Sequence, residues 1–305
     1  MKTFRSSLTA LFLLTFSSFL TAQTPYQTKT FTDTNLKSIV MDVSGSDISI
    51  ESWDQNSVKV DFFLESKSQS FMDSFNDKYE TNYSMEDGVV YVDLKRRSKW
   101  NFMSFNNKKM YYTVKVPKSF TLDLRTSGGD LSITDLIGTI EGKTSGGDIK
   151  IVDFKGIVDV STSGGDMDFT NVTGKIDAST SGGDINVQKC EGNLAFKTSG
   201  GDIDIKSADG KIFAETSGGD IELNVPKNAE DIDLETTGGD INIRIPKSDL
   251  TIELNSFGGD VKLSRDVDDD FKGKIKTSKV NGKLNKGGNL LNAKTTGGDI
   301  FLGYQ

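Results

Sequence analysis

The 305-residue sequence contains no histidine and only one cysteine. Without histidine, the chain cannot form a Ser-His-Asp triad, use an imidazole as a general base or bind a metal through imidazole. One cysteine excludes an intrachain disulfide and a zinc site made of several thiolates. That residue, Cys190, aligns with apolar turn residues of neighbouring repeats, so we expect a buried structural thiol. Four prolines and a net charge of −8 argue against a long disordered chain.

The first 22 residues are typical of a secretory signal peptide. Lys2 and Arg5 precede a short apolar run, and the small Ala22 stands directly before Gln23. We therefore expect cleavage after Ala22 and an exported protein that is periplasmic, secreted or held at the cell surface. No later stretch is apolar enough to span a bilayer. Because the mature chain keeps 34 basic against 44 acidic residues, we expect neither nucleic acid nor an anionic membrane as its partner.

The dominant feature is an internal repeat. The string TSGGD begins at Thr126 and recurs every 18 residues up to Thr216, and related strings begin at Thr236, Ser256 and Thr295. Apolar and polar residues alternate between these strings, a pattern typical of strands with one buried face. The sequence therefore predicts an all-β protein, a parallel β-solenoid of 18–20-residue coils. Because crossovers between parallel strands are usually right-handed, we expect a right-handed β-helix.

Both ends of the repeat region are less regular. We divide the chain into a signal peptide (1–22), an N-terminal cap with the first irregular coils (23–105) and the solenoid proper (106–305). Within the cap, apolar residues at helical spacing between positions 69 and 80 predict a helix. The string TSKVNG at Thr277 resembles a degenerate turn, and the chain stops one strand into a coil. The sequence thus predicts a thinly capped C-terminal edge.

The aspartates that close the repeated turns are expected to form a ladder along the solenoid. They are Asp130, Asp148, Asp166, Asp184, Asp202, Asp220, Asp240, Asp260 and Asp299. Carboxylates about 4.8 Å apart repel each other by about 1 kcal/mol per pair even in water. Either hydrogen bonds from turn N–H groups or a bound cation, most plausibly calcium, offsets this repulsion. The GGD string differs from the G-G-x-G-x-D calcium motif, so hydrogen bonding is favoured and no cofactor other than this calcium alternative is expected.

Two groups of aromatic residues are candidates for contact with a partner. An outward column reads Asp123, Glu141, Asp159 and Asp177 in successive repeats, but Phe213 interrupts it further along. A solvated face of mixed charge is the simpler interpretation of that column. In the loop WNFMSF, Trp100, Phe102 and Phe105 either pack on the cap or form an adhesive tip. The aspartate-rich run at 266–270 is expected to be a solvated loop.

The repeat resembles the bacterial putative-adhesin family, a domain of unknown function with a β-solenoid fold. The resemblance covers residues 36–305 and rests on the TSGGDI turns, on YTVKVPKSFTLDLRTSGGD (112–130) and on GKLNKGGNLLNAKTTGGDIFL (282–302). It implies an adhesin-like protein, but the family carries no agreed catalytic residues, so no site is transferred from it.

We expect a non-enzymatic protein that presents repetitive polar faces to a glycan, a matrix polymer or a cell-surface polymer. Many identical weak contacts would then add up through avidity. The alternative is an envelope structural or signalling module that binds a protein partner. A polysaccharide-active β-helix enzyme is the least favoured interpretation, because a catalytic groove needs unlike residues to converge and the coils from 126 to 256 are nearly interchangeable.

Overall fold

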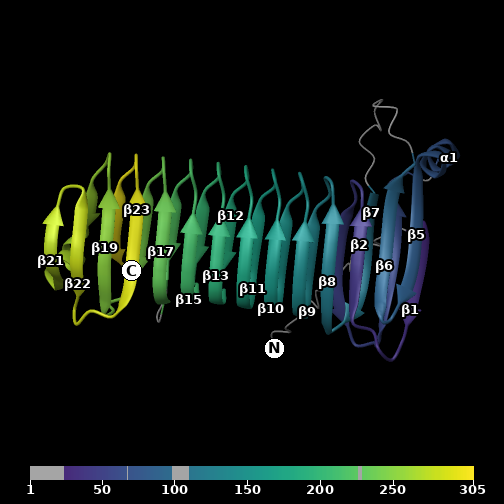
Figure 1. Cartoon of the computed structure of the whole chain (residues 1–305), viewed down its shortest axis with the longest axis horizontal. Coiled ribbons are helices and arrows are strands. Elements are labelled where there is room, and N and C mark those ends of the chain that lie inside the picture. Colours follow the sequence, from purple (N-terminus) through teal and green to yellow (C-terminus); the bar gives the residue numbers. More distant parts are fainter. Residues whose placement is uncertain (1–23, 67, 98–109, 226–228) are drawn as a thin grey trace, which may run out of the picture.

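The protein is a long rod of stacked strands (Figure 1). The computed structural model describes residues 24–66, 68–97, 110–225 and 229–305. Nearly all of its regular structure is β, which confirms the predicted all-β class and the long series of repetitive strands. The sheet winds through two layers whose inner faces share one hydrophobic core. We call these layers A and B.

Layer A runs along one side of the rod. From the N-terminal end of the rod it contains β5 (Tyr79–Glu86), β6 (Val89–Arg96), β2 (Ser38–Val43), β8 (Ser119–Thr126), the second halves of β9 (Leu131–Lys143), β10 (Ile149–Ser161) and β11 (Met167–Ser179), then β13 (Glu191–Lys197), β15 (Asp209–Glu215), β17 (Ala229–Thr236), β23 (Asn289–Thr295), β19 (Leu250–Ser256), β22 (Lys279–Leu284) and β21 (Phe271–Lys276).

Layer B runs along the opposite side. It contains β1 (Gln27–Thr32), β4 (Ser57–Leu64), β7 (Met110–Pro117), β3 (Asp47–Trp53), the first halves of β9, β10 and β11, then β12 (Ile185–Gln188), β14 (Ile203–Lys206), β16 (Ile221–Asn224), β18 (Ile241–Ile245), β24 (Ile300–Tyr304) and β20 (Val261–Leu263). Two helices lie near the ends of the rod, α1 (Gln69–Lys78) and α2 (Arg265–Asp270).

Strict alternation explains why both layers share one core. In β10, for example, Ile149, Ile151, Val158 and Val160 are buried, and the residues between Ile149 and Ile151 and between Val158 and Val160 face solvent. Ile149 pairs with Met167 of the next coil, so each buried residue stacks on an equivalent one 18 positions later. Burying one such aliphatic side chain contributes about 1.5–3 kcal/mol, and the same contribution recurs in every coil.

A sharp corner joins the two layers. The residue at its start has φ between 54° and 59° in five successive coils and is Asp135, Asp153, Asn171, Lys189 or Ser207. Aspartate and asparagine are among the residues that tolerate this left-handed conformation best. Three residues further on stands a glycine with positive φ; a Cβ on Gly156 would lie 1.9 Å from the carbonyl oxygen of the equivalent glycine below. Only glycine allows the coils to approach this closely.

The C-terminal coil does not lie at the end of the rod, so the predicted thin C-terminal edge is wrong. Strands β23 and β24 insert between the coil of β17–β18 and the coil of β19–β20 (Figure 1). The end of layer A is instead covered by the antiparallel hairpin β21–β22. Thr277 belongs to the tip of this hairpin rather than to a further coil, and its carbonyl accepts the N–H of Val261 at 2.6 Å. The aspartate run expected as a loop forms α2.

A comparable insertion occurs at the other end. Strands β2 and β3 stack between β6–β7 on one side and β8–β9 on the other. Strand β7 follows residue 106 but pairs with β3 and β4, which precede residue 105. The stacking of strands therefore crosses the boundary expected between residues 105 and 106. The antiparallel strands β5, β4 and β1 cover the outer edge. The predicted helix at 69–80 corresponds to α1, whose Phe75 packs against Phe62 with ring centroids 5.6 Å apart.

Candidate functional site

The repeated turn is held by a buried hydroxyl. In each turn this hydroxyl donates to a backbone carbonyl of the neighbouring coil at 2.7–3.0 Å and accepts the N–H of the second glycine of its own turn at 2.8–3.4 Å. The residues are Thr126, Thr144, Thr162, Thr180, Thr198, Thr216, Thr236, Ser256 and Thr295. Because both partners are backbone groups, the hydroxyl satisfies polar atoms that would otherwise be buried without a partner.

The turn aspartates form an unbroken chain of hydrogen bonds. In each pair, Oδ1 of one aspartate accepts the backbone N–H of the next at 2.7–3.0 Å. The order in space is Asp47, Asp130, Asp148, Asp166, Asp184, Asp202, Asp220, Asp240, Asp299 and Asp260. The first member, Asp47, was not among the predicted ladder residues, although it stands in SGSDI (44–48), a string that resembles the repeated turns. The ladder therefore joins coils, as the hydrogen-bonding interpretation predicted.

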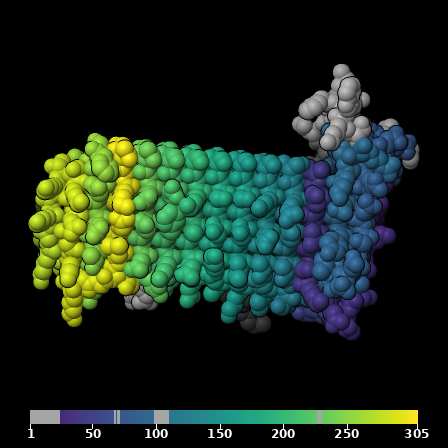
Figure 2. Space-filling model, viewed as in Figure 1, coloured from purple at the N-terminus to yellow at the C-terminus, as the bar shows by residue number. Residues whose placement is uncertain are grey.

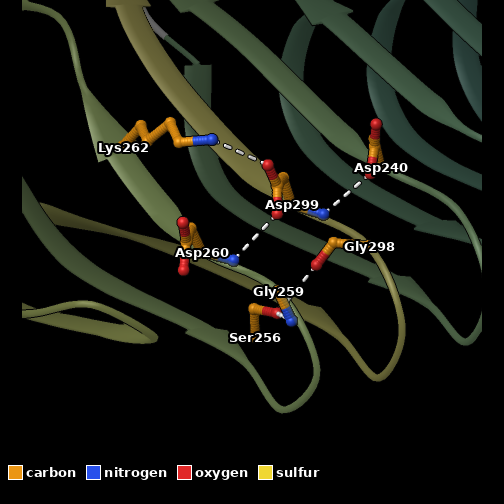
Figure 3. Close-up of polar contacts among 7 residues, drawn as sticks. All are labelled: Asp240, Ser256, Gly259, Asp260, Lys262, Gly298 and Asp299. Carbon is orange, nitrogen blue, oxygen red and sulfur yellow. Dashed lines mark hydrogen bonds and ion pairs between the residues drawn. The ribbon is translucent and has the colours of Figure 1, made fainter.

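The series of hydrogen bonds between aspartates ends at Asp260 and Asp299, where Lys262 contacts one of the carboxylates (Figure 3). Asp299 accepts the N–H of Asp260 at 2.8 Å through Oδ1 and contacts Lys262 Nζ at 2.8 Å through Oδ2. The hydrogen bond from Asp260, followed by the one from Lys262, holds the pKa of the Asp299 carboxyl below its usual range. Within the described ranges, no group of three or more His, Cys, Asp or Glu side chains could hold a metal ion. Calcium binding by the ladder stays a prediction.

Cys190 lies in the core at the layer corner, as predicted. Its side chain is 1% exposed, and burial raises the pKa of the thiol to about 11. A thiol with this pKa is almost wholly protonated at neutral pH, whereas the nucleophile is the thiolate. A structural role for Cys190 follows.

The outward side of layer A is a long, even surface (Figure 2). Glu141, Asp159 and Asp177 occupy equivalent positions in adjacent coils, and all three are exposed. In the part of the chain that the structure describes, no ion pair links these three to a cation. Further along, Lys197 contacts Glu215 at 3.0 Å. The predicted acidic column is thus a row of solvated carboxylates at Glu141, Asp159 and Asp177, whereas Asp123 at its start forms an ion pair with Arg125 at 3.0 Å.

Phe213 interrupts this column on β15, as the sequence indicated. Its ring is partly exposed, pairs with Ala195 of β13 and Asp233 of β17, and lies 5.0 Å from Lys197 Nζ. The small Ala195 leaves one edge of the ring uncovered by a long side chain. The Lys197 ammonium group lies over the ring and forms a cation–π contact with it. Trp100, Phe102 and Phe105 lie outside the described residues.

Layer B is also repetitive, but its charges are more evenly mixed. Lys150, Asp168 and Asn186 stand in register on β10, β11 and β12, and they line a shallow depression of about 360 Å³. Lys206 pairs with Asp204 at the far side of this depression. No described helix is long and apolar enough to cross a membrane.

A family model matches almost the whole chain. It describes the Toastrack DUF4097 domain and aligns with residues 36–302. The chain belongs to the Toastrack DUF4097 family. This confirms the predicted membership of an adhesin-like family of unknown function. A comparison with curated proteins finds no match.

Solved structures similar to this Toastrack chain include the following three from bacteria. A putative cell adhesion protein from Clostridium sporogenes is 14% identical, with a TM-score of 0.25 and coverage of 92% of this chain and 98% of the other. A putative adhesin from Bacteroides fragilis is 12% identical, with a TM-score of 0.40 and coverage of 91% and 96%. A putative lipid binding protein from Parabacteroides distasonis is 12% identical, with a TM-score of 0.34 and coverage of 93% and 98%. At these TM-scores the neighbours carry no argument about function.

Proposed function

We propose that this Toastrack protein is an exported, non-enzymatic, adhesin-like solenoid that binds an extended polymer through layer A. The coils that carry this surface are proposed to wind right-handed, with 18–20 residues each. The ligand would be a glycan, a matrix polymer or a cell-surface polymer, and each coil would make a weak contact of the same kind. Export rests on the signal-peptide pattern of residues 1–22.

The observation that carries the proposal is the in-register repetition of outward side chains. Glu141, Asp159 and Asp177 follow one another on neighbouring strands that lie about 4.8 Å apart. A polymer lying across the strands would meet the same chemical group at every step. Linked weak contacts of this kind raise the overall affinity without any strong single contact.

The turn chemistry supports a binding rather than a catalytic role. The threonine hydroxyls and one oxygen of each ladder aspartate are engaged by backbone groups, so they hold the scaffold. In most glycoside hydrolases two carboxyl groups stand on either side of the glycosidic bond, and different surroundings give them different pKa values. The outward acids of layer A instead share one environment, since they are exposed and equivalent.

The test is binding of residues 23–305 to an array of glycans and matrix polymers, first with calcium and then with a chelator. The key variant combines Glu141→Gln, Asp159→Asn and Asp177→Asn. Its matched control, on layer B, also removes three acidic groups and combines Asp168→Asn, Asp204→Asn and Glu222→Gln. We expect binding to be lost in the layer A variant and kept in the control, and each single substitution should have little effect.

Other outcomes would contradict the proposal. If one substitution abolished binding, the site would be local rather than multivalent. New chain ends on an incubated polysaccharide would reveal an enzyme. A blank array together with one stoichiometric protein partner, lost on deletion of residues 98–106, would establish the protein-binding alternative. Loss of binding in the presence of chelator would not contradict the proposal; it would show that binding requires calcium.

A further inference from the structure

The C-terminal end of the rod carries a concentration of positive charge, although the chain as a whole is acidic. Residues 271–288 contain six lysines and no acidic residue. They comprise the hairpin β21–β22 and the turn that follows it, at the far end of the rod from β5 (Figure 1). All six lysines, at positions 272, 274, 276, 279, 283 and 286, are exposed.

Five of these lysines share one face of the hairpin. Lys272, Lys274 and Lys276 alternate along β21, and Lys279 and Lys283 alternate along β22. Residues of the opposite parity point to the core side, where Val280 and Leu284 are fully buried. We call the outward face with the five lysines the basic hairpin face.

The pairing of the two strands places like charges directly opposite each other. Lys272 pairs with Lys283, and Lys276 pairs with Lys279. Directly opposed like charges destabilise an antiparallel pair. Within the described ranges, no carboxylate forms an ion pair with any lysine of this face. On neighbouring strands of the same layer, by contrast, Lys294 contacts Glu235 at 2.9 Å.

The nearest acidic run does not neutralise this face. The aspartates of α2 precede β21 in sequence, but α2 packs against β24 of layer B. Asp270 is engaged there by Lys247 at 2.9 Å and by the Tyr304 hydroxyl at 3.0 Å. On layer A, Glu253 of β19 stands opposite Asn281 rather than opposite a lysine.

Protection of an open sheet edge explains only part of this arrangement. Lysine on an edge strand hinders pairing with other chains, and β21 is such a strand. However, β22 pairs with β21 on one side and with β19 on the other, so it is not an edge. Lys279 and Lys283 therefore have no edge to protect, yet they add two ammonium groups beside the three of β21.

We propose that the basic hairpin face is a docking site for a linear acidic polysaccharide, one with carboxylate or sulfate groups. Lysines two positions apart on a strand are separated by about 6.8 Å, and the two rows lie about 4.8 Å apart. This forms a flat double row that fits a chain of regularly spaced anions. The site lies at the C-terminal end of layer A, several strands away from Glu141, Asp159 and Asp177, and does not depend on those acidic residues.

The chemistry of the face favours a polysaccharide over other polyanions. Its outward residues are lysines and Asn281, with no aromatic ring on which a nucleobase could stack. The basic hairpin face itself carries no apolar side chain that could insert into a bilayer; Ile275 is 51% exposed but lies on the opposite face of β21. A depression of about 580 Å³ beside the hairpin is lined by Gly273, Lys274, Lys276, Lys279 and Asn281, which gives room for a sugar ring between the ammonium groups.

The test uses residues 23–305 and immobilised dextran sulfate and polygalacturonate, with neutral dextran as the reference polymer. The test variant replaces Lys272, Lys274, Lys276, Lys279 and Lys283 by glutamine. A control variant replaces the exposed lysines at positions 143, 150, 155, 175 and 211 by glutamine, which gives the same net charge. We expect affinity for the acidic polymers to fall about tenfold or more in the test variant only, because each removed ammonium group loses a screened attraction.

Further arms make the outcome decisive. A variant with arginine at the same five positions should keep binding, which separates loss of charge from loss of folding. The layer A triple variant should bind the acidic polymers as the unaltered protein does. Equal losses in the test and control variants would show unspecific attraction and overturn the proposal. Binding of anionic phospholipid vesicles but not of the polysaccharides, or no binding of any acidic polymer, would also overturn it.

Discussion

Replacing Gly165 with alanine should destabilise the solenoid far more than replacing its neighbour Gly164. Both glycines belong to one turn, and neither has the positive φ that would disfavour alanine. A Cβ on Gly165 would lie 2.0 Å from the carbonyl oxygen of Gly147 in the adjacent coil, and 2.4 Å from its carbonyl carbon. A Cβ on Gly164 would meet nothing closer than 3.8 Å.

The size of the destabilisation follows from the groups that the new Cβ would push apart. Overpacking against rigid surroundings costs about 1–3 kcal/mol. If the coils separate to relieve it, the bond from Thr162 to Gly147 O at 3.0 Å and the bond from Asp166 N to Asp148 Oδ1 at 2.9 Å lengthen, and each lost bond adds about 1 kcal/mol. We expect Gly165→Ala to lower the free energy of unfolding by about 3–5 kcal/mol.

The matched substitution Gly164→Ala should change stability little. Alanine at a compatible position restricts the unfolded chain, so we expect at most a gain of about 0.4–1 kcal/mol. Urea unfolding of residues 23–305 gives both values, and hydrogen exchange should show faster exchange in the coils next to residue 165 only. Equal stabilities for the two variants would refute the close approach of the coils at this glycine.

Three further perturbations test other parts of the structure. Thr180→Val should lower the free energy of unfolding by about 1–3 kcal/mol, because two buried backbone groups lose their partner, whereas the exposed Ser181→Ala should not; urea unfolding measures both. Cysteines introduced together at Asp233 and Asn292 should form a disulfide on mild oxidation, as these residues pair on β17 and β23. Asp299→Asn should reduce the loss of stability in acid, measured by unfolding between about pH 2 and 6.

The sign of the acid effect follows from the lowered pKa of Asp299. A carboxyl with a lowered folded pKa stabilises the protein fully above its ordinary pKa, and this contribution disappears as the pH falls through the lowered value. Identical pH profiles for the variant and the unaltered protein would contradict the role given to Lys262 and Asp260.

A disulfide between cysteines at 233 and 253, but not at 233 and 292, would contradict the inserted coil.

Local patterns were sufficient to predict the strands, the core and the turns. Alternation in segments such as 149–152 specifies which side chains are buried, and the 18-residue spacing specifies which residue stacks on which. The function of the turn aspartates was open in sequence, since it depends on whether Oδ1 of Asp148 reaches the N–H of Asp166. At 2.9 Å it does.

The order of the coils at the C-terminus could not be predicted by the same means. The segment 289–304 alternates in the same way as 250–263, so either could stack on β17–β18. What distinguishes them is the continuation of the chain: α2 and the lysine-rich hairpin follow β20, and β22 pairs along the open side of β19. A coil with such a cap can only be terminal, and the plain coil β23–β24 takes the interior place.

The basic hairpin face was not predicted, although its lysines stand close together in the sequence. The signal in the sequence is the run 272–286, which has no acidic residue in a chain of net charge −8. Only the antiparallel register shows that Lys272 faces Lys283. A sequence alone does not fix that register.

The central claim is multivalent binding by layer A. It is tested most directly by measuring how the affinity changes with the number of coils whose outward acidic residue is neutralised. Affinity for a polymer identified on the array should be measured for variants in which one, two or three of Glu141, Asp159 and Asp177 are neutralised. We predict a small loss of affinity for any single substitution and a loss that multiplies with each further coil that is altered. Abolition of binding by one of the three, with no effect from the other two, would contradict it.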